Sequence, residues 1–243
     1  MSTVSTGSTG GRTSDDRVRR TMDVTRSLLL RSGYKRTTMD EIARRADIGK
    51  GTIYLSWDTK DDLIRTLVIQ EIAGVCQDIS RITFLRPAVA RLSELTRELF
   101  TLVFKYPLFR ALYTHDKEIL GKACDDPRFD FQCYRFTTFA PFREYLRMLH
   151  DKELWNPCDG FALDAVLSGF IKLHLHAEIA GATLDAGARA DCLAGVVRSS
   201  FEPADRLPAE ELSEAARRTV EIFDEAAANY RAKLIRRPMA ASV

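Results

Sequence analysis

Residues 37–63 of the chain read TTMDEIARRADIGKGTIYLSWDTKDDL, and this stretch decides the fold. Thr38 followed by Glu41 is the pattern of a capping box, in which the hydroxyl accepts from a free backbone N–H and the carboxylate reaches back to the cap. One apolar face then recurs at helical spacing, formed by Ile42, Ala43 and Ala46. The stretch therefore predicts a short helix that begins next to Thr38.

A second helix is expected after a tight turn. Asp47-Ile48-Gly49 is a break of the length found in a helix-turn-helix, whose turn needs a residue that tolerates positive φ. Lys50–Tyr54 then opens a helix with a cation, small residues, a hydroxyl and a phenol, which suit a surface that approaches phosphates and base edges. Thr59 and Asp62 repeat the capping pattern for a third helix. The stretch thus predicts a helix-turn-helix that binds DNA.

The run from about Arg17 to Val68 resembles the TetR family of one-component transcriptional repressors. The resemblance rests on the order and spacing of Ser32-Gly33-Tyr34, Thr37-Thr38, Ile42-Ala43, Gly51-Thr52-Ile53-Tyr54, and Lys60 with Leu63, about a fifth of the chain. The turn departs from the family, which usually has glycine at Asp47 and serine at Gly49. The recognition segment departs as well, because Leu55 and Ser56 stand where an aromatic residue and often histidine follow the tyrosine. Asp tolerates the left-handed region, so the fold prediction stands, but no operator sequence can be copied from a relative.

The resemblance implies a set of DNA contacts, carried over residue by residue. Groove and phosphate contacts are expected from Lys50, Gly51, Thr52 and Tyr54. Base-edge contacts are expected from Leu55 and Ser56. Flanking phosphates would be held by Thr37, Thr38 and Lys60, the last helped by helix-end amides. Trp57 is expected to fill the core behind the recognition helix.

The charge distribution agrees with a nucleic-acid partner. The 243-residue chain has a net charge of +2, but Arg12–Thr66 holds 13 Lys/Arg against 9 Asp/Glu, giving +4 there and −2 elsewhere. A basic end on a near-neutral body is typical of a DNA-reading module joined to a sensor. The alternative is that these cations are only a solvated helix face.

The composition predicts a cytoplasmic protein without a metal or cofactor. The first 14 residues have no apolar h-region, and no apolar run approaches the roughly 18–20 residues of a membrane helix. Five scattered cysteines fit reduced thiols: Cys76, Cys124, Cys133, Cys158 and Cys192. His174 and His176 point about 200° apart on a helix and cannot chelate one ion together. No nucleophile elbow, phosphate loop or metalloprotease helix supports an enzyme.

The remaining chain reads as all-α. We expect a disordered tail at 1–14, a helix-turn-helix domain at 15–62, and a helical effector-binding and dimerisation domain at 63–243. Arg12 in the tail would enter a minor groove or simply lack order. The helices are predicted at 15–32, 59–82, 87–107, 107–123, 127–150 with a kink or break at Pro141, 159–184, 188–199 and 208–235.

Residues 100–145 are the second informative region, since they hold twelve of the 22 aromatic residues. Rings that line a bundle leave shaped gaps for flat or lipophilic molecules, although ordinary core aromatics give the same pattern. With the resemblance, the cluster predicts an effector pocket. The aromatic candidates are Phe100, Phe104, Phe109, Tyr113, Tyr134, Phe139, Phe142 and Phe170. The polar candidates are His115, Arg143, His174 and Glu178.

A homodimer is expected because one recognition helix reads too few base pairs to find an operator. Two helices offer a surface for it, at 159–184 and 208–235. The candidate interface residues are Phe161, Ala165, Ile171, Leu212, Val220, Phe223, Ala227, Tyr230 and Leu234. The alternative is that both helices pack in the core of their own subunit.

The function predicted from the sequence is ligand-controlled binding to a palindromic operator in double-stranded DNA. An apolar small molecule in the bundle would change the spacing of the two recognition helices through the helix at 59–82. Neither the identity of this effector nor the sign of its action follows from the sequence. The runner-up is a helical enzyme or lipid carrier without sequence-specific DNA binding.

Overall fold

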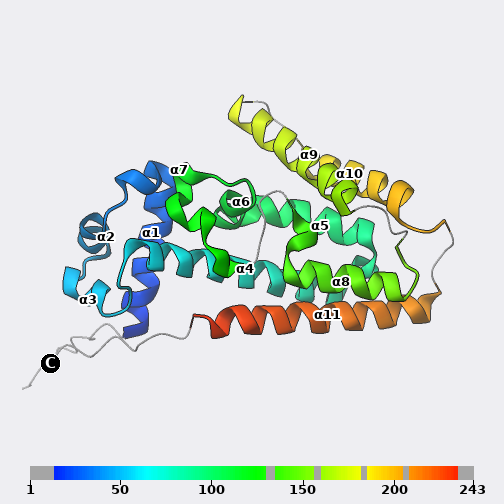
Figure 1. The fold of residues 1–243 in the computed structure, drawn as a ribbon, viewed down its shortest axis with the longest axis horizontal. Coiled ribbons are helices and arrows are strands. Elements are labelled where there is room, and N and C mark those ends of the chain that lie inside the picture. The colour runs from blue at the N-terminus through cyan, green and yellow to red at the C-terminus, as the bar shows by residue number, and fades with distance from the viewer. Residues whose placement is uncertain (1–13, 130–134, 156–159, 182–184, 205–207, 235–243) are drawn as a thin grey trace, which may run out of the picture.

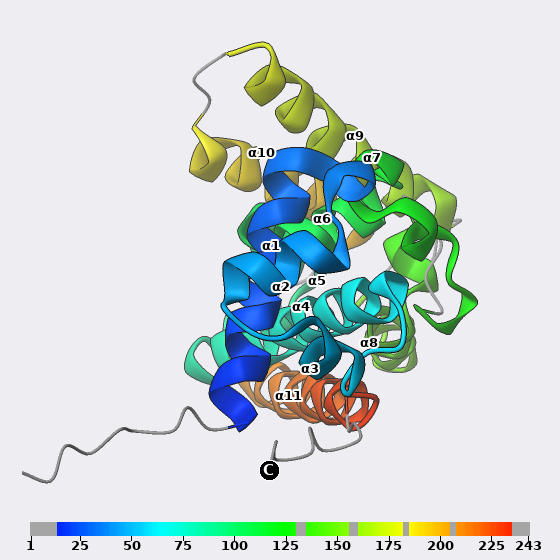
Figure 2. The ribbon, with the colours of Figure 1, turned by 90° about the vertical axis from the view of Figure 1, so that its left-hand side faces the viewer.

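The computed structural model describes residues 14–129, 135–155, 160–181, 185–204 and 208–234. Within these ranges every element is a helix, which confirms the all-α fold. The predicted tail at 1–14 lies outside them except for its last residue. The helices form an elongated body with α1, α2 and α3 at one end (Figure 1). Figure 2 views the molecule from that end.

The N-terminal unit consists of α1 (Ser14–Arg36), α2 (Met39–Ala46), α3 (Lys50–Tyr54) and the first turn of α4 (Lys60–Leu85). Its core is made of fully or almost fully enclosed side chains, among them Ile42, Ala46, Ile53 and Trp57. The burial of Trp57 confirms its predicted place behind the recognition helix. The boundary predicted after residue 62 falls in the first turn of α4, which continues into the C-terminal part without a break.

The two predicted caps have different outcomes. Thr59 and Asp62 form the complete capping box at the start of α4. Thr38 accepts from the Glu41 N–H at 3.2 Å, as predicted. The Glu41 carboxylate instead binds Arg44 and Arg45, so the second half of that box is a correction. Two guanidinium groups within reach attract the carboxylate more strongly than one backbone N–H does.

The C-terminal part is a helical bundle built around α4. Its elements are η1 (Pro87–Ala90), α5 (Leu92–Lys105), α6 (Pro107–Tyr113), α7 (Lys117–Leu120), η2 (Gly121–Asp125), η3 (Pro127–Phe129), η4 (Phe136–Thr138), α8 (Ala140–Asp151), α9 (Gly160–Ile179), α10 (Ala186–Phe201) and α11 (Ala209–Ala232). The long α11 packs along α4, and α10 packs along α5 (Figure 1).

Two predicted helices are divided into shorter elements, and in the helix expected at 87–107 the short 3-10 helix η1 precedes α5. The helix expected at 107–123 ends at Tyr113, because His115 takes a left-handed φ of 54° and the Asp116 side chain caps a new helix. Of the helix expected at 127–150, α8 begins only at Ala140 with Pro141 in its first turn, which agrees with the predicted break at Pro141. The described residues before it form the short 3-10 helices η3 and η4. Proline is favoured in a first turn, where its missing N–H costs nothing.

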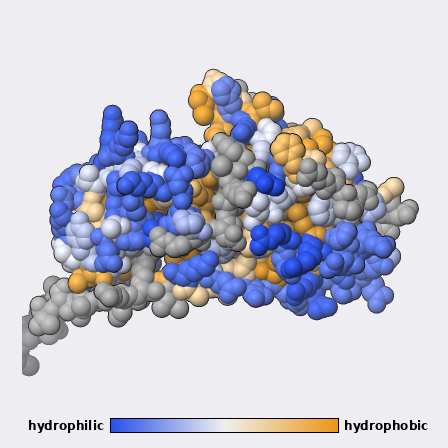
Figure 3. All heavy atoms as spheres, in the orientation of Figure 1, coloured by the Kyte–Doolittle hydropathy of each residue, from blue (hydrophilic) through white to orange (hydrophobic). Residues whose placement is uncertain are grey.

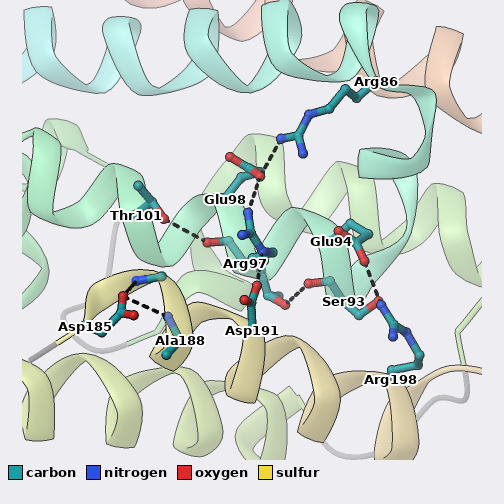
Figure 4. A network of polar contacts seen from close by, with 12 residues as sticks. Arg86, Ser93, Glu94, Arg97, Glu98, Thr101, Asp185, Ala188, Asp191 and Arg198 are labelled. Carbon is teal, nitrogen blue, oxygen red and sulfur yellow. Dashed lines mark hydrogen bonds and ion pairs between the residues drawn. The ribbon is translucent and has the colours of Figure 1, made fainter.

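Ion pairs fix α10 against α5 (Figure 4). Arg97 Nε lies 2.5 Å from Asp191 Oδ1, and Arg198 Nη2 lies 2.6 Å from Glu94 Oε1. Asp191 and Arg198 lie on one side of α10, beside the buried residues Ala194 and Val197, and these two ion pairs fasten the edge of α10 to α5.

The N-terminal unit meets the bundle where the end of α1 packs on α7 and η2. Gly33 interrupts α1 with a φ of 74°, and Tyr34 then lies against Gly121. The Tyr34 hydroxyl donates to Asp61 Oδ1 at 2.7 Å, and burial with this bond raises the pKa of Tyr34 to about 12. The ring is thus a fixed neutral contact between the two parts.

Gly121→Ala tests this junction. A Cβ at Gly121 would lie 2.4 Å from the Tyr34 ring, on a backbone with φ of 59° that alanine disfavours. We expect a loss of about 2–4 kcal/mol in the free energy of unfolding, measured by urea titration. Gly51→Ala is the control, because a Cβ there meets nothing within 4 Å and should stabilise the helix by up to about 1 kcal/mol. Equal stability of the two variants would contradict the close packing.

Candidate nucleic-acid interface

The helix-turn-helix presents α3 at the surface. Asp47 ends α2 in the left-handed region, with φ 52° and ψ 53°, as its tolerance of that region predicted. Gly49 then precedes α3 in an extended conformation. Tyr54 and Leu55 are 42% and 46% exposed at the far end of α3, although both are apolar or aromatic. Exposed rings and alkyl groups on a short helix are suited to contact with another surface.

The start of α3 is a small polar surface. The Lys50 ammonium lies 2.5 Å from Asp40 Oδ1, and this bond raises the pKa of Lys50. Lys50 therefore carries its positive charge, and a phosphate would compete with Asp40 for it. Gly51 is exposed and Thr52 is half-buried. The lack of a side chain at Gly51 lets another molecule approach the helix backbone closely.

Two residues predicted to touch DNA are enclosed instead. Thr37 is fully buried, and its hydroxyl donates to the Gly33 carbonyl at 2.8 Å. The Ser56 hydroxyl is buried and finds no hydrogen-bond partner among the described residues. Ser56 follows the end of α3 at Tyr54; the residue as a whole is half-buried, and its hydroxyl points inward. Thr38, by contrast, is exposed and can still donate its hydroxyl hydrogen.

Lys60 has an internal role that the sequence pattern did not indicate. Its ammonium donates to the carbonyls of Tyr34 at 2.9 Å and Thr37 at 3.0 Å, and lies 3.6 Å from the centre of the Tyr34 ring. Burial lowers the pKa of Lys60. With two of three N–H donors used, at most one remains for a phosphate. Lys60 thus holds the segment between α1 and α2 in place. Its ammonium has one N–H left at most for the predicted phosphate contact.

The Asp62 carboxylate holds the start of α4 in place. Oδ2 accepts from the Thr59 backbone N–H at 3.1 Å and the Thr59 hydroxyl at 2.8 Å. Arg65 donates to Oδ1 at 2.5 Å and also to Asp126. Burial acts to raise the pKa of Asp62, but these bonds outweigh it, and the pKa falls below its ordinary value of 3.8.

Asp62→Asn should therefore change how stability depends on pH. A carboxyl with a lowered pKa in the folded state adds stability above pH 3.8, and this stability is lost as the pH falls through the folded-state pKa. We expect the variant to be less stable by about 1 kcal/mol at neutral pH. Urea titrations between pH 7 and pH 3 should show the gap closing on acidification. A constant gap would assign the loss to packing.

A buried carboxylate joins the N-terminal unit to the bundle. Glu71 of α4 is 4% exposed. Its Oε1 accepts from Arg26 Nε of α1 at 3.0 Å, and its Oε2 accepts from the backbone N–H groups of Leu108 and Phe109 at 2.7 and 3.0 Å. Those N–H groups belong to the first turn of α6 and have no partner within that helix. Burial raises the pKa of Glu71, opposed by these bonds.

The predicted effector residues divide into a packed aromatic cluster and a set outside it. Tyr113 stacks on Phe136 at 4.3 Å between ring centroids, and Phe109 lies 6.2 Å from Phe139. The predicted rings that are buried are Phe100, Phe109, Tyr113, Phe139 and Phe142. Phe104 and Phe170 are half-buried, and Tyr134 lies outside the described residues. The cluster is closed by its own rings, so an effector would have to separate them.

Of the polar candidates, only His174 is enclosed with the rings. It is 2% exposed, and its ring lies 5.3 Å from Phe100 and 4.6 Å from Phe104. Its Nδ1 has no hydrogen-bond partner in the part of the chain that the structure describes. Glu178 is exposed and lies 3.6 Å from His174 Nε2. His115 faces Asp125 at 3.3 Å, and Arg143 is at the surface. The kink at His115 and the late start of α8 direct these two away from the cluster.

The predicted dimer residues also divide. Phe223, Ala227 and Tyr230 of α11 are buried against their own subunit, where Phe223 lies 6.3 Å from the Tyr145 ring. Ile171 is buried as well, while Leu212, Val220 and Leu234 are half-buried. The buried residues pack within their own subunit, because a stripe with steps of three and four fits α4 as well as a partner chain; an interface at α11 stays a prediction. Phe161 and Ala165 of α9 are exposed.

The side of α9 that faces away from the bundle carries large exposed apolar side chains, together with the exposed Lys172 and His176. Phe161, Leu173 and Ile179 are 67%, 68% and 77% exposed. Apolar side chains gather along α9 at the upper edge of the molecule (Figure 3). Of these three residues only Phe161 was among the candidate interface residues, since only the structure shows which side of α9 is covered by α5 and α10.

Within the described ranges, no group of three or more His, Cys, Asp or Glu side chains is arranged to hold a metal ion. In the same ranges, no helix has the length and apolar character needed to cross a membrane.

The model of a family described as bacterial regulatory proteins, tetR family, matches residues 22–67. The fold is similar to that of a TetR-family transcriptional regulator from Mesorhizobium loti MAFF303099, with a TM-score of 0.55 and 16% identity over 78% of this chain and 98% of that one. A tetR family regulator from Shewanella sp. PV-4 gives a TM-score of 0.48 and 13% identity over 77% and 98%. A gamma-butyrolactone receptor (ArpA like protein) gives 0.48 and 16% over 89% and 98%. A comparison with curated proteins gives no match.

Proposed function

We propose that this chain, a DNA-binding transcriptional regulator of the TetR family, is a repressor that an apolar small molecule releases from a palindromic operator. The observation that carries the proposal is the exposed surface of α3, with Lys50, Tyr54 and Leu55, on a compact helix-turn-helix. Lys50 and Tyr54 would contact phosphates, and Leu55 would pack against a base, for example a thymine methyl. Gly51 would allow the close approach, and Thr38 would hold a flanking phosphate.

The homodimer would form through α9 and α10 rather than α11. The exposed apolar side chains of α9 would form the centre of this interface, and the exposed residues of α10 next to it, among them Ala188, Cys192 and Gly195, would complete it. Two such pairs from two subunits make a four-helix interface. A two-fold dimer would place its recognition helices about 34–36 Å apart, in successive major grooves.

The effector would enter the aromatic cluster between α5, α6 and α9. It would be mainly apolar, with one hydrogen-bonding group that pairs with His174 Nδ1. A buried polar atom without a partner costs free energy, so a ligand that satisfies it gains affinity. To release DNA, the effector must bind the DNA-incompetent state more tightly, by about 1–3 kcal/mol for a 5- to 150-fold effect.

Selection from random double-stranded DNA tests the regulator reading. We expect enrichment of an inverted repeat, with log affinity falling linearly against log salt concentration as phosphates are neutralised. Enrichment of a non-palindromic site, or of none, would contradict the proposal.

Leu55 and Ser56 provide a matched pair in the same selection. Leu55→Tyr should change the preferred half-site at one or two positions, each worth about 1–3 kcal/mol, because Leu55 is exposed on α3. Ser56→Ala should leave the preference unchanged, because the Ser56 hydroxyl is buried. A changed preference with Ser56→Ala alone would mean that the recognition segment turns outward on DNA.

Leu173→Glu tests the dimer surface. A carboxylate at this exposed position of α9 would be buried without a partner in the proposed interface, costing several kcal/mol. We expect the wild type to be a dimer by light scattering and the variant a folded monomer. Phe84→Glu is the control, because Phe84 is 74% exposed at the far end of α4 and should not affect assembly. A dimeric Leu173→Glu variant would place the interface elsewhere.

A further inference from the structure

Glu71 occupies the point where three helices with different tasks meet. Arg26 belongs to α1 of the DNA-binding unit, and Leu108 and Phe109 belong to α6 of the bundle. Glu71 itself lies on α4, which runs through both parts. One buried carboxylate is therefore bonded at the same time to the unit that would read DNA and to the helix that borders the aromatic cluster.

The short helix α6 is well placed to sense that cluster. It has seven residues, and its first turn is held by Glu71. The same helix carries Phe109, which contacts the Phe136 and Phe139 rings, and Tyr113, whose hydroxyl lies 2.6 Å from Ser168 Oγ of α9. A ligand that separates Phe109 or Tyr113 from these rings pushes on α6, and α6 cannot move without straining its two bonds to Glu71.

Those bonds are difficult to replace. The carboxylate is almost completely buried, so water cannot take the place of a lost donor without entering the core. When α6 moves, Glu71 must follow it or lose two charge-assisted hydrogen bonds, and in following it pulls on Arg26. We propose that Glu71 is the positioning residue through which the state of the aromatic cluster sets the position of α1. The structural link through Glu71 stands without the proposed function. Its use, which is to carry an effector signal to DNA binding, rests on that proposed function.

Other contacts also join the N-terminal unit to the bundle, but they do not reach the aromatic cluster. Arg65 bonds Asp126 in the segment after η2, and the backbone at Gly33 packs on Glu118 of α7. Neither contact involves a ring of the cluster. They hold the two parts together, whereas Glu71 links the N-terminal unit to the helix that carries Phe109 and Tyr113.

Urea unfolding of the free full-length chain tests the link, because each part holds one of the two tryptophans. Trp155→Phe leaves Trp57, which is 2% exposed in the N-terminal unit, as the only indole reporter. Far-UV ellipticity reports mainly the larger bundle. In this parent, we expect the fluorescence and ellipticity transitions to coincide. With Glu71→Gln added, the Trp57 transition should move to lower urea than the ellipticity transition.

Glu98→Gln is the matched control for that experiment. Glu98 of α5 is 8% exposed and pairs with Arg86 and Arg97, but it has no contact with α1 or α6 among its ion pairs. Glu98→Gln should lower the free energy of unfolding, but the Trp57 fluorescence and ellipticity transitions should still coincide. Coincident transitions in Glu71→Gln, or equal separation in Glu98→Gln, would overturn the inference. If Glu71→Gln does not fold, Arg26→Met takes its place, because it removes the α1 partner of Glu71. We expect it to separate the two transitions in the same way.

Hydrogen exchange with the selected DNA then tests the direction of the coupling. Coupling is reciprocal, so DNA bound at α3 should slow exchange of the α6 amides, by at least about fivefold in the parent, and this slowing should disappear in Glu71→Gln. DNA binding without any slowing in the parent would overturn the inference and leave the regulator reading intact. A chain that binds no selected DNA would contradict the proposed function, while the urea experiment still decides the role of Glu71.

Discussion

The buried carboxylate of Glu71 is the constraint on which the arrangement of the molecule depends. A carboxylate at 4% exposure is tolerated only because a guanidinium and two helix-terminal N–H groups surround it. These partners come from α1 and α6, so the requirement to satisfy one charge fixes the relative position of three helices. Burying this charge costs free energy, but it also makes the contact between α1, α4 and α6 specific, since few other arrangements would supply the carboxylate with hydrogen-bond donors.

Local patterns gave the fold reliably where the chemistry is local. The cap at Thr59 and Asp62, the left-handed Asp47 and the buried Trp57 follow from residue type and spacing, and each is present in the structure. Where two local interactions competed, the pattern was insufficient. Glu41 bonds Arg44 and Arg45 rather than the cap, and the left-handed His115 divides a helix that periodicity left whole.

The site was predicted less completely because exposure is a tertiary property. Thr37, Ser56 and Lys60 have the residue types of DNA contacts, but their hydroxyl and ammonium groups face the interior. The apolar stripe of α11 likewise contains no information on whether α4 or a partner chain covers it. Glu71 could not be found from sequence, since its partners lie 45 and about 37 residues away.

The exposed apolar side of α9 has a consequence for how the protein would respond to its own abundance. Phe161, Leu173 and Ile179 leave a free protomer with a surface that water solvates poorly. If pairing through α9 precedes binding, the amount of DNA-competent species rises with the square of the protomer concentration while protomers predominate. The occupancy of a DNA site would then change more steeply than the concentration of the protein does.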